Sequence, residues 1–284
     1  MATRPRPLVI LGSINLDLIA TAARLPRPGE TVGGGILTRQ PGGKGANQAA
    51  AAARLDGCSR LVGAVGDDGP GREMLAALTA IGVDTGGVAV REDPTGTALI
   101  LVDALGENEI VVCPGANSHV TLDGIRLDHD DLLLCQLEVG IDVVLAASRR
   151  HPGFLALNAT PAQRLPEELV RRCDLVIVNE TEYASIPELT DAGLVAVTFG
   201  AEGSALFEEG KLVARAPGEK ADVVNTIGAG DAFCAALVLA LRAKMAYAEA
   251  LAVANRVGAH AVTQAASQPA LSPLSHYLMG AAGS

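Results

Sequence analysis

The chain has no tryptophan, and aromatic residues make up only 2% of its 284 positions. A hydrophobic core must therefore be built from small and aliphatic side chains, which supply most of the 49% of apolar residues. Such side chains are typical of parallel strands, because helices cover both faces of a parallel sheet. The composition predicts an α/β protein with enough apolar material for a large core.

Runs of basic residues are also missing, since 22 Lys and Arg stand against 32 Asp and Glu and the net charge is −10. Nucleic acids are bound by clustered Lys and Arg, so we expect no nucleic-acid partner. The longest apolar runs, such as residues 235–241, are far shorter than the roughly 18 residues of a membrane span, so we expect no membrane partner. The N-terminal segment lacks the pattern of a signal peptide, which predicts a cytoplasmic protein.

Cysteine is scarce and unpatterned. The five cysteines are odd in number, widely spaced and contain no CxxC pair, so they indicate neither a disulfide framework nor a zinc site. The five are Cys58, Cys113, Cys135, Cys173 and Cys234. We expect most of these cysteines to be small buried side chains.

What the chain does have is an alternation of short apolar runs with helical segments. The predicted strands are residues 8–11, 132–137, 154–157, 175–178 and 194–198, and the predicted helices are residues 46–55, 71–81, 143–150, 167–172, 231–242 and 247–263. Such alternation indicates right-handed crossovers and a central, mostly parallel sheet flanked by helices, in one domain over residues 1–284. A hairpin is expected at residues 204–215, and strands within 31–40 and 97–113 form an appendage to this core.

The strongest local signal is the segment NTIGAGD, residues 225–231, which lies directly before an apolar helix. Amides of Gly228, Ala229 and Gly230 at a helix N-terminus can bind an anion. Asp231 would then lie beside a bound phosphate and could accept the proton of an attacking hydroxyl. The alternative is a tight turn in which Asp231 only caps the helix.

Two further segments are rich in glycine. PGGKGAN, residues 41–47, brings Lys44 and Asn47 to the start of a helix, where they suit a polyol. It is not a P-loop, because no Ser or Thr follows Lys44. Residues 63–71 lack the spacing of a dinucleotide fingerprint, and Asp67 and Asp68 would repel a pyrophosphate. We therefore expect an ordinary loop there.

Polar residues also follow two predicted strands. Asn15 and Asp17 come after the first strand, and the segment NETE, which begins at Asn179, comes after the strand at 175–178. Ligands of parallel sheets bind at the carboxyl ends of the strands. The alternatives are turn-forming residues in the first case and a solvated helix start in the second.

Together these segments resemble the ribokinase-like (PfkB-type) family of carbohydrate kinases, and its ribokinase branch in particular. The resemblance covers nearly the whole chain, through SINLD, PRPGETV, PGGKGANQAAAAARL, GDDGPG, PGAN, QLE, NETE, TIGAGD and SQP. It implies transfer of phosphate from ATP to the primary hydroxyl of D-ribose, giving ribose 5-phosphate and ADP. Another pentose or a nucleoside could be the acceptor instead, and an inactive sugar-binding regulator is a further alternative.

The resemblance also implies roles for individual residues. Asp231 would be the catalytic base, and Gly228, Ala229 and Gly230 would form the anion hole. The sugar site would comprise Asn15, Asp17, Gly43, Lys44, Gly45, Ala46, Asn47 and Glu138. The nucleotide site would comprise Asn179, Thr198, Phe199, Gly200, Ala201, Glu202, Gly203, Gly230 and Asn255, with Glu182 holding Mg²⁺ through water.

Two more features follow from the resemblance. Strands from about 14–40 and 95–114 would form a β-lid that pairs with a second copy in a homodimer. A monovalent cation, K⁺, would be bound near Asn225, Ile227, Ala261, Gln264, Ala266 and Ala270. Relatives usually carry Asp in place of Asn225 and Ser in place of Ala270, so we expect weak or absent dependence on K⁺. The stretch between Glu182 and Leu194 also looks shorter than in the family.

Overall fold

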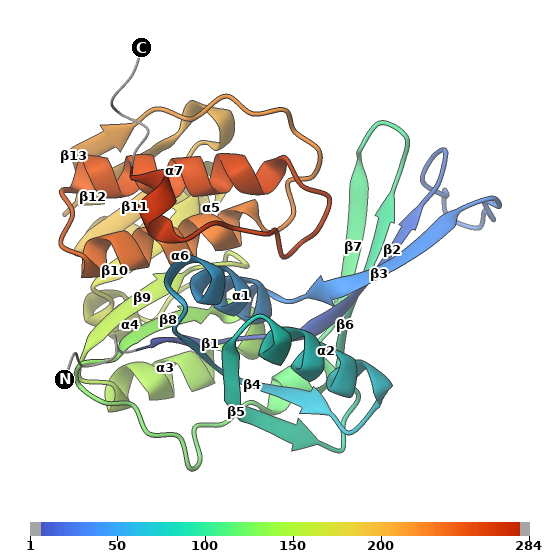
Figure 1. The fold of residues 1–284 in the computed structure, drawn as a ribbon, viewed down its shortest axis with the longest axis horizontal. Helices are drawn as coiled ribbons and strands as arrows, with labels where there is room; N and C mark the ends of the chain where they lie inside the picture. The colour runs from blue at the N-terminus through green and yellow to red at the C-terminus, as the bar shows by residue number, and fades with distance from the viewer. Residues whose placement is uncertain (1–6, 279–284) are drawn as a thin grey trace.

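The protein contains two β-sheets of different size, as seen in a computed structural model that describes residues 7–278 (Figure 1). The larger sheet has nine strands in the order β13-β12-β11-β10-β9-β8-β1-β4-β5. Their bounds are β1 (Leu8–Leu11), β4 (Ser59–Gly66), β5 (Val83–Arg91), β8 (Leu132–Gln136), β9 (Phe154–Asn158), β10 (Leu175–Asn179), β11 (Leu194–Thr198), β12 (Ser204–Glu208) and β13 (Lys211–Ala216). The pairs from β5 across to β11 are parallel, and only β12 and β13 pair antiparallel, which confirms the predicted fold class.

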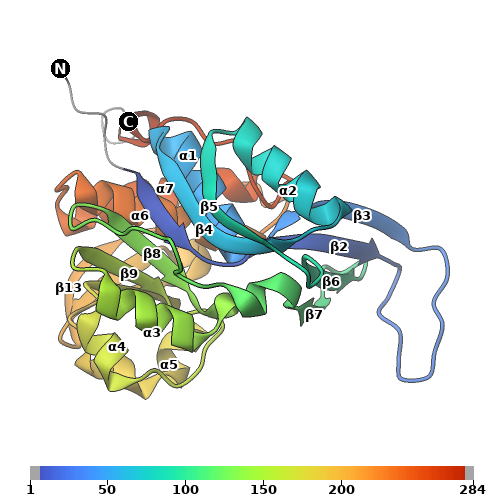
Figure 2. The same ribbon diagram turned by 90° about the horizontal axis from the view of Figure 1, so that it is seen from below.

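Helices cover both faces of this sheet (Figure 2). Strand β1 shows why: Leu8 and Ile10 point into one apolar cluster and Val9 and Leu11 into the other. The first cluster includes residues of α1 (Lys44–Asp56), α2 (Gly69–Ala80), α6 (Ala229–Arg242) and α7 (Tyr247–Val262). The second includes residues of α3 (Ile141–Arg150) and α4 (Glu167–Arg172), and α5 (Glu180–Ser185) lies on the same side. Strand β1 is apolar at every position because neither face of the sheet meets water there.

The smaller sheet projects from one end of the molecule (Figure 1). It has the order β3-β2-β6-β7 and is called the lid below. Its strands are β2 (Asn15–Thr21), β3 (Ile36–Gly42), β6 (Gly96–Val102) and β7 (Asn108–Cys113). Residues 12–14 alone separate β1 from β2, so the chain passes from the large sheet into the lid almost without interruption.

The expectation of a loop at residues 63–71 was wrong. Residues 63–66 end β4, and α2 begins at Gly69. The glycines allow close packing instead of a flexible turn, because a Cβ at Gly66 would lie 2.6 Å from the Asp93 carbonyl oxygen. Asp68 caps α2 by accepting a hydrogen bond from the Gly71 amide at 2.7 Å. Asn15 and Asp17 follow β1 as predicted, and they lie within β2 rather than in a turn.

None of the helices in residues 7–278 has the length and hydropathy needed to cross a bilayer.

Candidate active site

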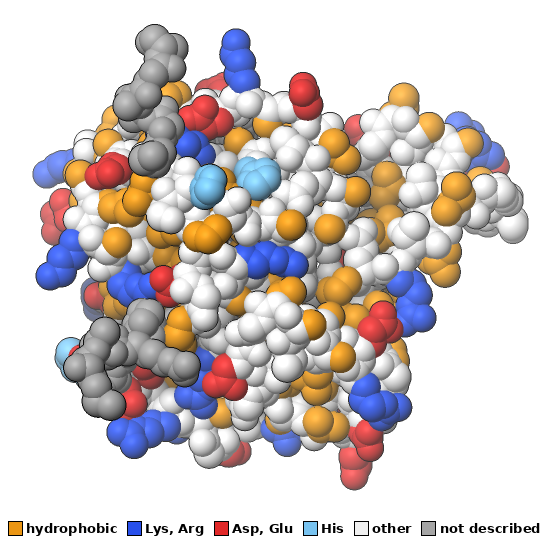
Figure 3. Space-filling model, viewed as in Figure 1, with side chains coloured by type: hydrophobic (Ala, Val, Ile, Leu, Met, Phe, Trp, Pro, Cys, Tyr) orange, Lys and Arg blue, Asp and Glu red, His pale blue; other side chains and the backbone are white. Residues whose placement is uncertain are grey.

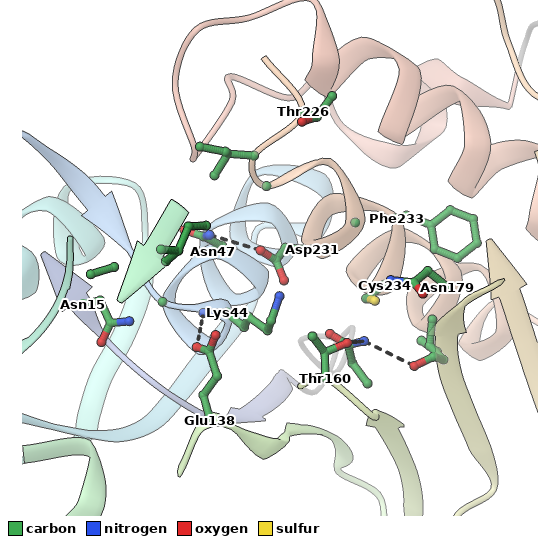
Figure 4. Close-up of a pocket in the computed structure, with 18 of the residues that line it drawn as sticks. Asn15, Lys44, Asn47, Glu138, Thr160, Asn179, Thr226, Asp231, Phe233 and Cys234 are labelled. Atoms are coloured by element: carbon green, nitrogen blue, oxygen red, sulfur yellow. Dashed lines mark hydrogen bonds between the residues drawn. The ribbon is translucent and has the colours of Figure 1, made fainter. Parts of the chain in front are cut away.

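A pocket of about 360 Å³ lies between the lid and the carboxyl ends of the large sheet's strands (Figure 4). This is the edge at which open α/β sheets bind their ligands. Its polar lining comes from distant parts of the chain and includes Asn15, Asp17, Lys44, Asn47, Glu138, Asn158, Thr160, Asn179, Glu182, Thr198, Thr226 and Asp231, together with Gly43, Gly228 and Gly230.

Asp231 is the third residue of α6 and is almost fully buried. The N-cap of this helix is Gly228, in a left-handed conformation with φ 79°, so Asp231 does not cap the helix. Only glycine fits there, because a Cβ would lie 2.0 Å from the Ser267 carbonyl oxygen. Gly228 and Gly230 line the pocket, whereas Ala229 does not, and its amide donates to Thr226 at 3.3 Å.

Two side-chain amides donate to the Asp231 carboxylate. Asn47 Nδ2 lies 3.1 Å from Oδ2, and Gln48 Nε2 lies 3.0 Å from Oδ1. Burial raises the pKa of Asp231, while Lys44 and the two amides oppose that rise by favouring the charged form. The result is a buried, hydrogen-bonded carboxylate that faces the pocket.

Lys44 begins α1, and its ammonium points toward Asp231 in Figure 4. Burial alone would lower the pKa of Lys44, but the negative charges of Asp231 and Glu138 outweigh it and leave the pKa raised. Lys44 is therefore a cation under all physiological conditions. Its backbone amide donates to Glu138 Oε2 at 3.1 Å, and the Ser13 hydroxyl donates to the same oxygen.

Asn15 and Asp17 reach the pocket from the lid. Asn15 Oδ1 accepts a hydrogen bond from Asn117 Nδ2 at 2.8 Å, which fixes its orientation. Burial, with Glu138 and Asp231 adding to it, raises the pKa of Asp17 to about 7. Asp17 therefore changes its charge near neutral pH.

Gly45 and Ala46, predicted to belong to the sugar site, do not line the pocket. Both are buried on the inner side of α1. A Cβ at Gly45 would lie 2.4 Å from the Gly12 carbonyl carbon, so this glycine lets α1 approach the end of β1. Only the neighbours Gly43, Lys44 and Asn47 present atoms to the cavity.

Asn179 and Glu182 form a capping box at the start of α5. Asn179 Oδ1 accepts from the Glu182 amide, and Glu182 Oε2 accepts from the Asn179 amide, both at 2.8 Å. Thr160 donates to the other oxygen, Glu182 Oε1, at 2.7 Å. The carboxylate is thereby held at the pocket wall, although each oxygen retains a second lone pair for a water molecule.

The remaining residues predicted for the nucleotide lie outside the pocket lining. Phe199 to Gly203 form the turn after β11, which contains the 3₁₀ helix η4 (Gly200–Glu202). None of these five residues lines the pocket, whereas Thr198, the last residue of β11, does. Asn255 is buried in α7, where it donates to the carbonyl oxygens of Ala216 and Pro217 and accepts from the Ser204 hydroxyl.

Sequence reasoning missed Asn158 and Thr160 in the pocket lining, and Gln48 behind it. Asn158 is the last residue of β9, directly after the apolar run at 154–157. A polar residue at the end of a buried strand was the signal that could have identified it, as it identified Asn179.

The loops expected to hold a monovalent cation do not fit one. The Asn225 side chain donates to the Ala265 carbonyl at 2.8 Å and accepts from the Ile227 amide at 3.0 Å. The Gln264 side chain donates to the Ala270 carbonyl at 3.1 Å. The Gln264 amide thus takes up the carbonyl oxygen of Ala270, one of the expected residues, and the neutral Asn225 amide attracts a cation less than a carboxylate does. Ala261 and Ala266 supply only backbone oxygens at best.

Residues 6–273 match the family described as pfkB family carbohydrate kinase. The chain belongs to this family. A Bacillus subtilis ribokinase is 35% identical to it over 280 residues, which cover 93% of this chain and 95% of the relative.

Solved structures of the pfkB-type kinases agree with this assignment. A Thermotoga maritima ribokinase superimposes with a TM-score of 0.87 at 27% identity, over 96% of this chain and 99% of that one. An Arabidopsis thaliana ribokinase solved with ribose and ATP superimposes with a TM-score of 0.83 at 28% identity, over 96% and 97%. This member of the pfkB family is therefore a carbohydrate kinase with the architecture of these enzymes.

Proposed function

We propose that this kinase transfers the terminal phosphate of ATP to the primary hydroxyl of D-ribose, giving ribose 5-phosphate and ADP. The observation that carries the proposal is the position of Asp231, which shares one pocket with the polar groups of the lid and of the α1 loop. Relatives of this chain include ribokinases from several organisms, and one ribokinase was solved with ribose and ATP.

Polar side chains on the lid side of the pocket suit a small polyol. Asn15, Asp17, Asn47 and Glu138 offer amides and carboxylates that can pair with several sugar hydroxyls. Gly43 exposes bare backbone beside them, with φ 86°. A sugar held by these groups would present one hydroxyl to Asp231.

Asp231 is the proposed base. The sugar oxygen attacks the γ-phosphorus of ATP, and the hydroxyl proton passes to the Asp231 carboxylate. The bond between the γ-phosphorus and the β,γ-bridging oxygen breaks, and ADP leaves. Amides of Gly228 and Gly230, at the N-terminus of α6, would bind the oxygens of the transferred group. The Lys44 ammonium would add positive charge near the same point.

The ATP side of the pocket is assigned to Asn179, Thr198 and Glu182. Residues 7–278 contain no cluster of three or more His, Cys, Asp or Glu that could hold a metal ion. Mg²⁺ in kinases is held largely by phosphate oxygens and water, so a single fixed carboxylate fits its needs. We assign Glu182 to its water shell, where Mg²⁺ would offset phosphate charge. The turn from Phe199 to Gly203 and Asn255 are assigned to the approach of the adenine.

The lid is the proposed surface for a homodimer. Several of its apolar side chains are about half exposed or more: Ile36, Leu37, Ile110, Val111 and Val112. Figure 3 shows hydrophobic side chains at the surface of this part of the molecule. Ile110 and Val112 also line the pocket, so a second lid packed there would cover the bound sugar. We further place the kinase in the cytoplasm, where its substrates are found.

Release of ADP from Mg²⁺-ATP with a panel of acceptors tests the proposal. The panel contains ribose, deoxyribose, fructose, adenosine and no sugar. We expect turnover with ribose, and product analysis should locate the phosphate on the 5-oxygen. Turnover with adenosine alone would replace ribose by a nucleoside, and binding of ribose without ADP release would indicate a regulator.

A further inference from the structure

Gln48 does not line the pocket, but its side chain contacts the Asp231 carboxylate. The side chain is fully buried on α1, directly after Asn47, and it is not among the residues that line the cavity. Its Nε2 donates to Asp231 Oδ1 at 3.0 Å and to Asn158 Oδ1 at 3.0 Å. Both hydrogens of the amide are therefore used.

Gln136, at the end of β8, holds this amide in one orientation. Its Nε2 donates to Gln48 Oε1, so the acceptor end of Gln48 is occupied. An ionised Asp231 offers no hydrogen to donate, and only the NH₂ end of Gln48 can face it. Gln136 is fully buried, and a Cβ at Gly12 would lie 1.8 Å from its Oε1, so close packing fixes Gln136 in turn.

Burial without such a donor favours the neutral acid. Transfer of a carboxylate from water disfavours its charged form, and each hydrogen bond to the charged form opposes that effect. Asp231 receives two of these bonds, but one comes from Asn47, which lines the pocket and is assigned to the sugar. Gln48 is the donor that stays with the carboxylate whether or not a sugar is bound.

We propose that Gln48 is a positioning residue that keeps Asp231 ionised and aimed at the pocket, with Gln136 orienting the Gln48 amide. The proposal rests on the assignment of Asp231 as the base. Gln48 acts only through Asp231, because its burial prevents contact with either substrate.

Other charged and titratable groups face Asp231 and remain when Gln48 is changed. Lys44 on α1 favours the ionised acid, whereas Glu138 disfavours it. Asp17 on the lid is coupled to Asp231, and so is the buried thiol of Cys234 on α6. A change in the ionisation of Asp231 in a Gln48 variant can therefore be assigned to the lost amide only if these four side chains are unaltered.

The test is the pH dependence of turnover in Gln48→Met, which keeps the shape of the side chain and removes its donors. We expect the acid limb of kcat/KM to move upward by about one to two pH units, since a hydrogen bond to a charged group is worth roughly that much. On the acid side of the limb, kcat/KM at a fixed pH should fall about 10- to 100-fold, and it should recover at alkaline pH. KM for ribose and for ATP should not change, because Gln48 touches neither.

A double-mutant cycle tests the part assigned to Gln136. Gln136→Met should move the acid limb in the same direction by less, because the freed Gln48 amide can rotate. In the Gln48→Met background the same change should add nothing, as expected for two residues that act in series. Ser148→Ala, a buried polar deletion in α3 on the opposite face of the sheet, should leave the acid limb in place.

Gln48→Glu is the variant to measure if the methionine variants fold poorly. It is isosteric and places a second carboxylate beside Asp231, so the acid limb should move further upward. An acid limb at the wild-type pH in these variants, or a loss of turnover that is equal at every pH, would overturn the proposal and leave Gln48 with a packing role.

The titration of Asp231 can also be followed without any substrate, by carboxyl signals in ¹³C NMR or infrared difference spectra. Asp231→Asn identifies the signal by its disappearance. The midpoint should be higher in Gln48→Met than in the wild type. This readout separates the two proposals, because absence of ribose phosphorylation by the wild type would refute the substrate assignment while the midpoints still decide the role of Gln48.

Discussion

The Asn47 amide and the Asp231 carboxylate are 184 positions apart in the chain, and their side chains are joined by a hydrogen bond of 3.1 Å (Figure 4). Asn47 lies in the first turn of α1, the helix that follows the glycine-rich turn, and Asp231 lies in the first turn of α6. The bond connects the segment assigned to the sugar with the segment assigned to the phosphate. With the Gln48 bond to the same carboxylate, it joins the two strongest motifs of the sequence directly.

Replacement of Asp231 by Asn should nearly abolish turnover and leave sugar binding intact. Asn preserves the shape of the side chain but cannot accept the hydroxyl proton, so kcat should fall on the order of 10²- to 10⁴-fold. Isothermal titration with ribose and a coupled ADP assay measure the two effects. Near-normal turnover of the variant would remove Asp231 from the role of base.

Asp17 should lower the stability of the free protein at neutral and alkaline pH. Its pKa is about 7 in the folded state and 3.8 ordinarily, so between these values the folded protein binds more protons than the unfolded chain. The free energy of unfolding must therefore fall as the pH rises through that window. Asp17→Asn cannot ionise and should be more stable at pH 8, on the order of 1–3 kcal/mol.

Urea unfolding at a series of pH values measures this difference. The control is Asp142→Asn, which removes an exposed carboxylate from the first turn of α3. The control should follow the wild-type pH dependence. Equal pH dependence in the wild type and in Asp17→Asn would show that Asp17 ionises at its ordinary pKa.

Exchange of Na⁺ for K⁺ should leave the rate of this kinase unchanged. The Asn225 amide joins the segment before α6 to the segment after α7 by donating to the Ala265 carbonyl, and the Gln264 amide donates to the Ala270 carbonyl within the second segment. Asn225→Asp removes one donor and supplies a carboxylate, so this variant should gain activity with rising K⁺. Initial rates at constant ionic strength decide the question, and a large stimulation of the wild type by K⁺ would contradict the prediction.

A charge placed on the apolar face of the lid should dissociate the proposed dimer. Val112→Lys would bury an ammonium between two lids, and burial of an unpaired charge is costly. Sedimentation velocity should show a shift from dimer to monomer. Leu212→Lys is the matched control, because Leu212 is an exposed aliphatic residue of a strand in the large sheet, and it should not alter the sedimentation. A monomeric wild type would refute the dimer.

Most of the fold could be predicted, because its strands are short apolar runs between helical segments. The hairpin of β12 and β13 and the helices α6 and α7 were predicted to within two residues of their ends. The strands β4 and β5 were missed. The glycines of β4 were interpreted as loop signals, whereas Gly63 and Gly66, like Gly87 in β5, allow close contact with neighbouring backbone, which depends on tertiary packing.

The candidate site was predicted where its residues belong to dense local motifs. Asn47, Asp231, Asn179 and the lid residues were named from such motifs, and all of them line one pocket. Gln48 could not be recognised, because nothing in its neighbourhood distinguishes a core glutamine from one that contacts a carboxylate. Its partners lie 88 to 183 positions away, so only the folded chain brings them together.

The pocket is lined by residues of two parts of the molecule, the lid and the large sheet with its helices, which the short connection from β1 to β2 joins. Asn15 and Asp17 are built into the lid, whereas Asp231 stands on a helix of the large sheet. Any swing of the lid as a unit would carry the residues assigned to the sugar away from the proposed base. In the free protein, one motion would open the pocket and separate the lid residues from Asp231. Bound ATP would then be protected from attack by water until an acceptor binds and the lid closes.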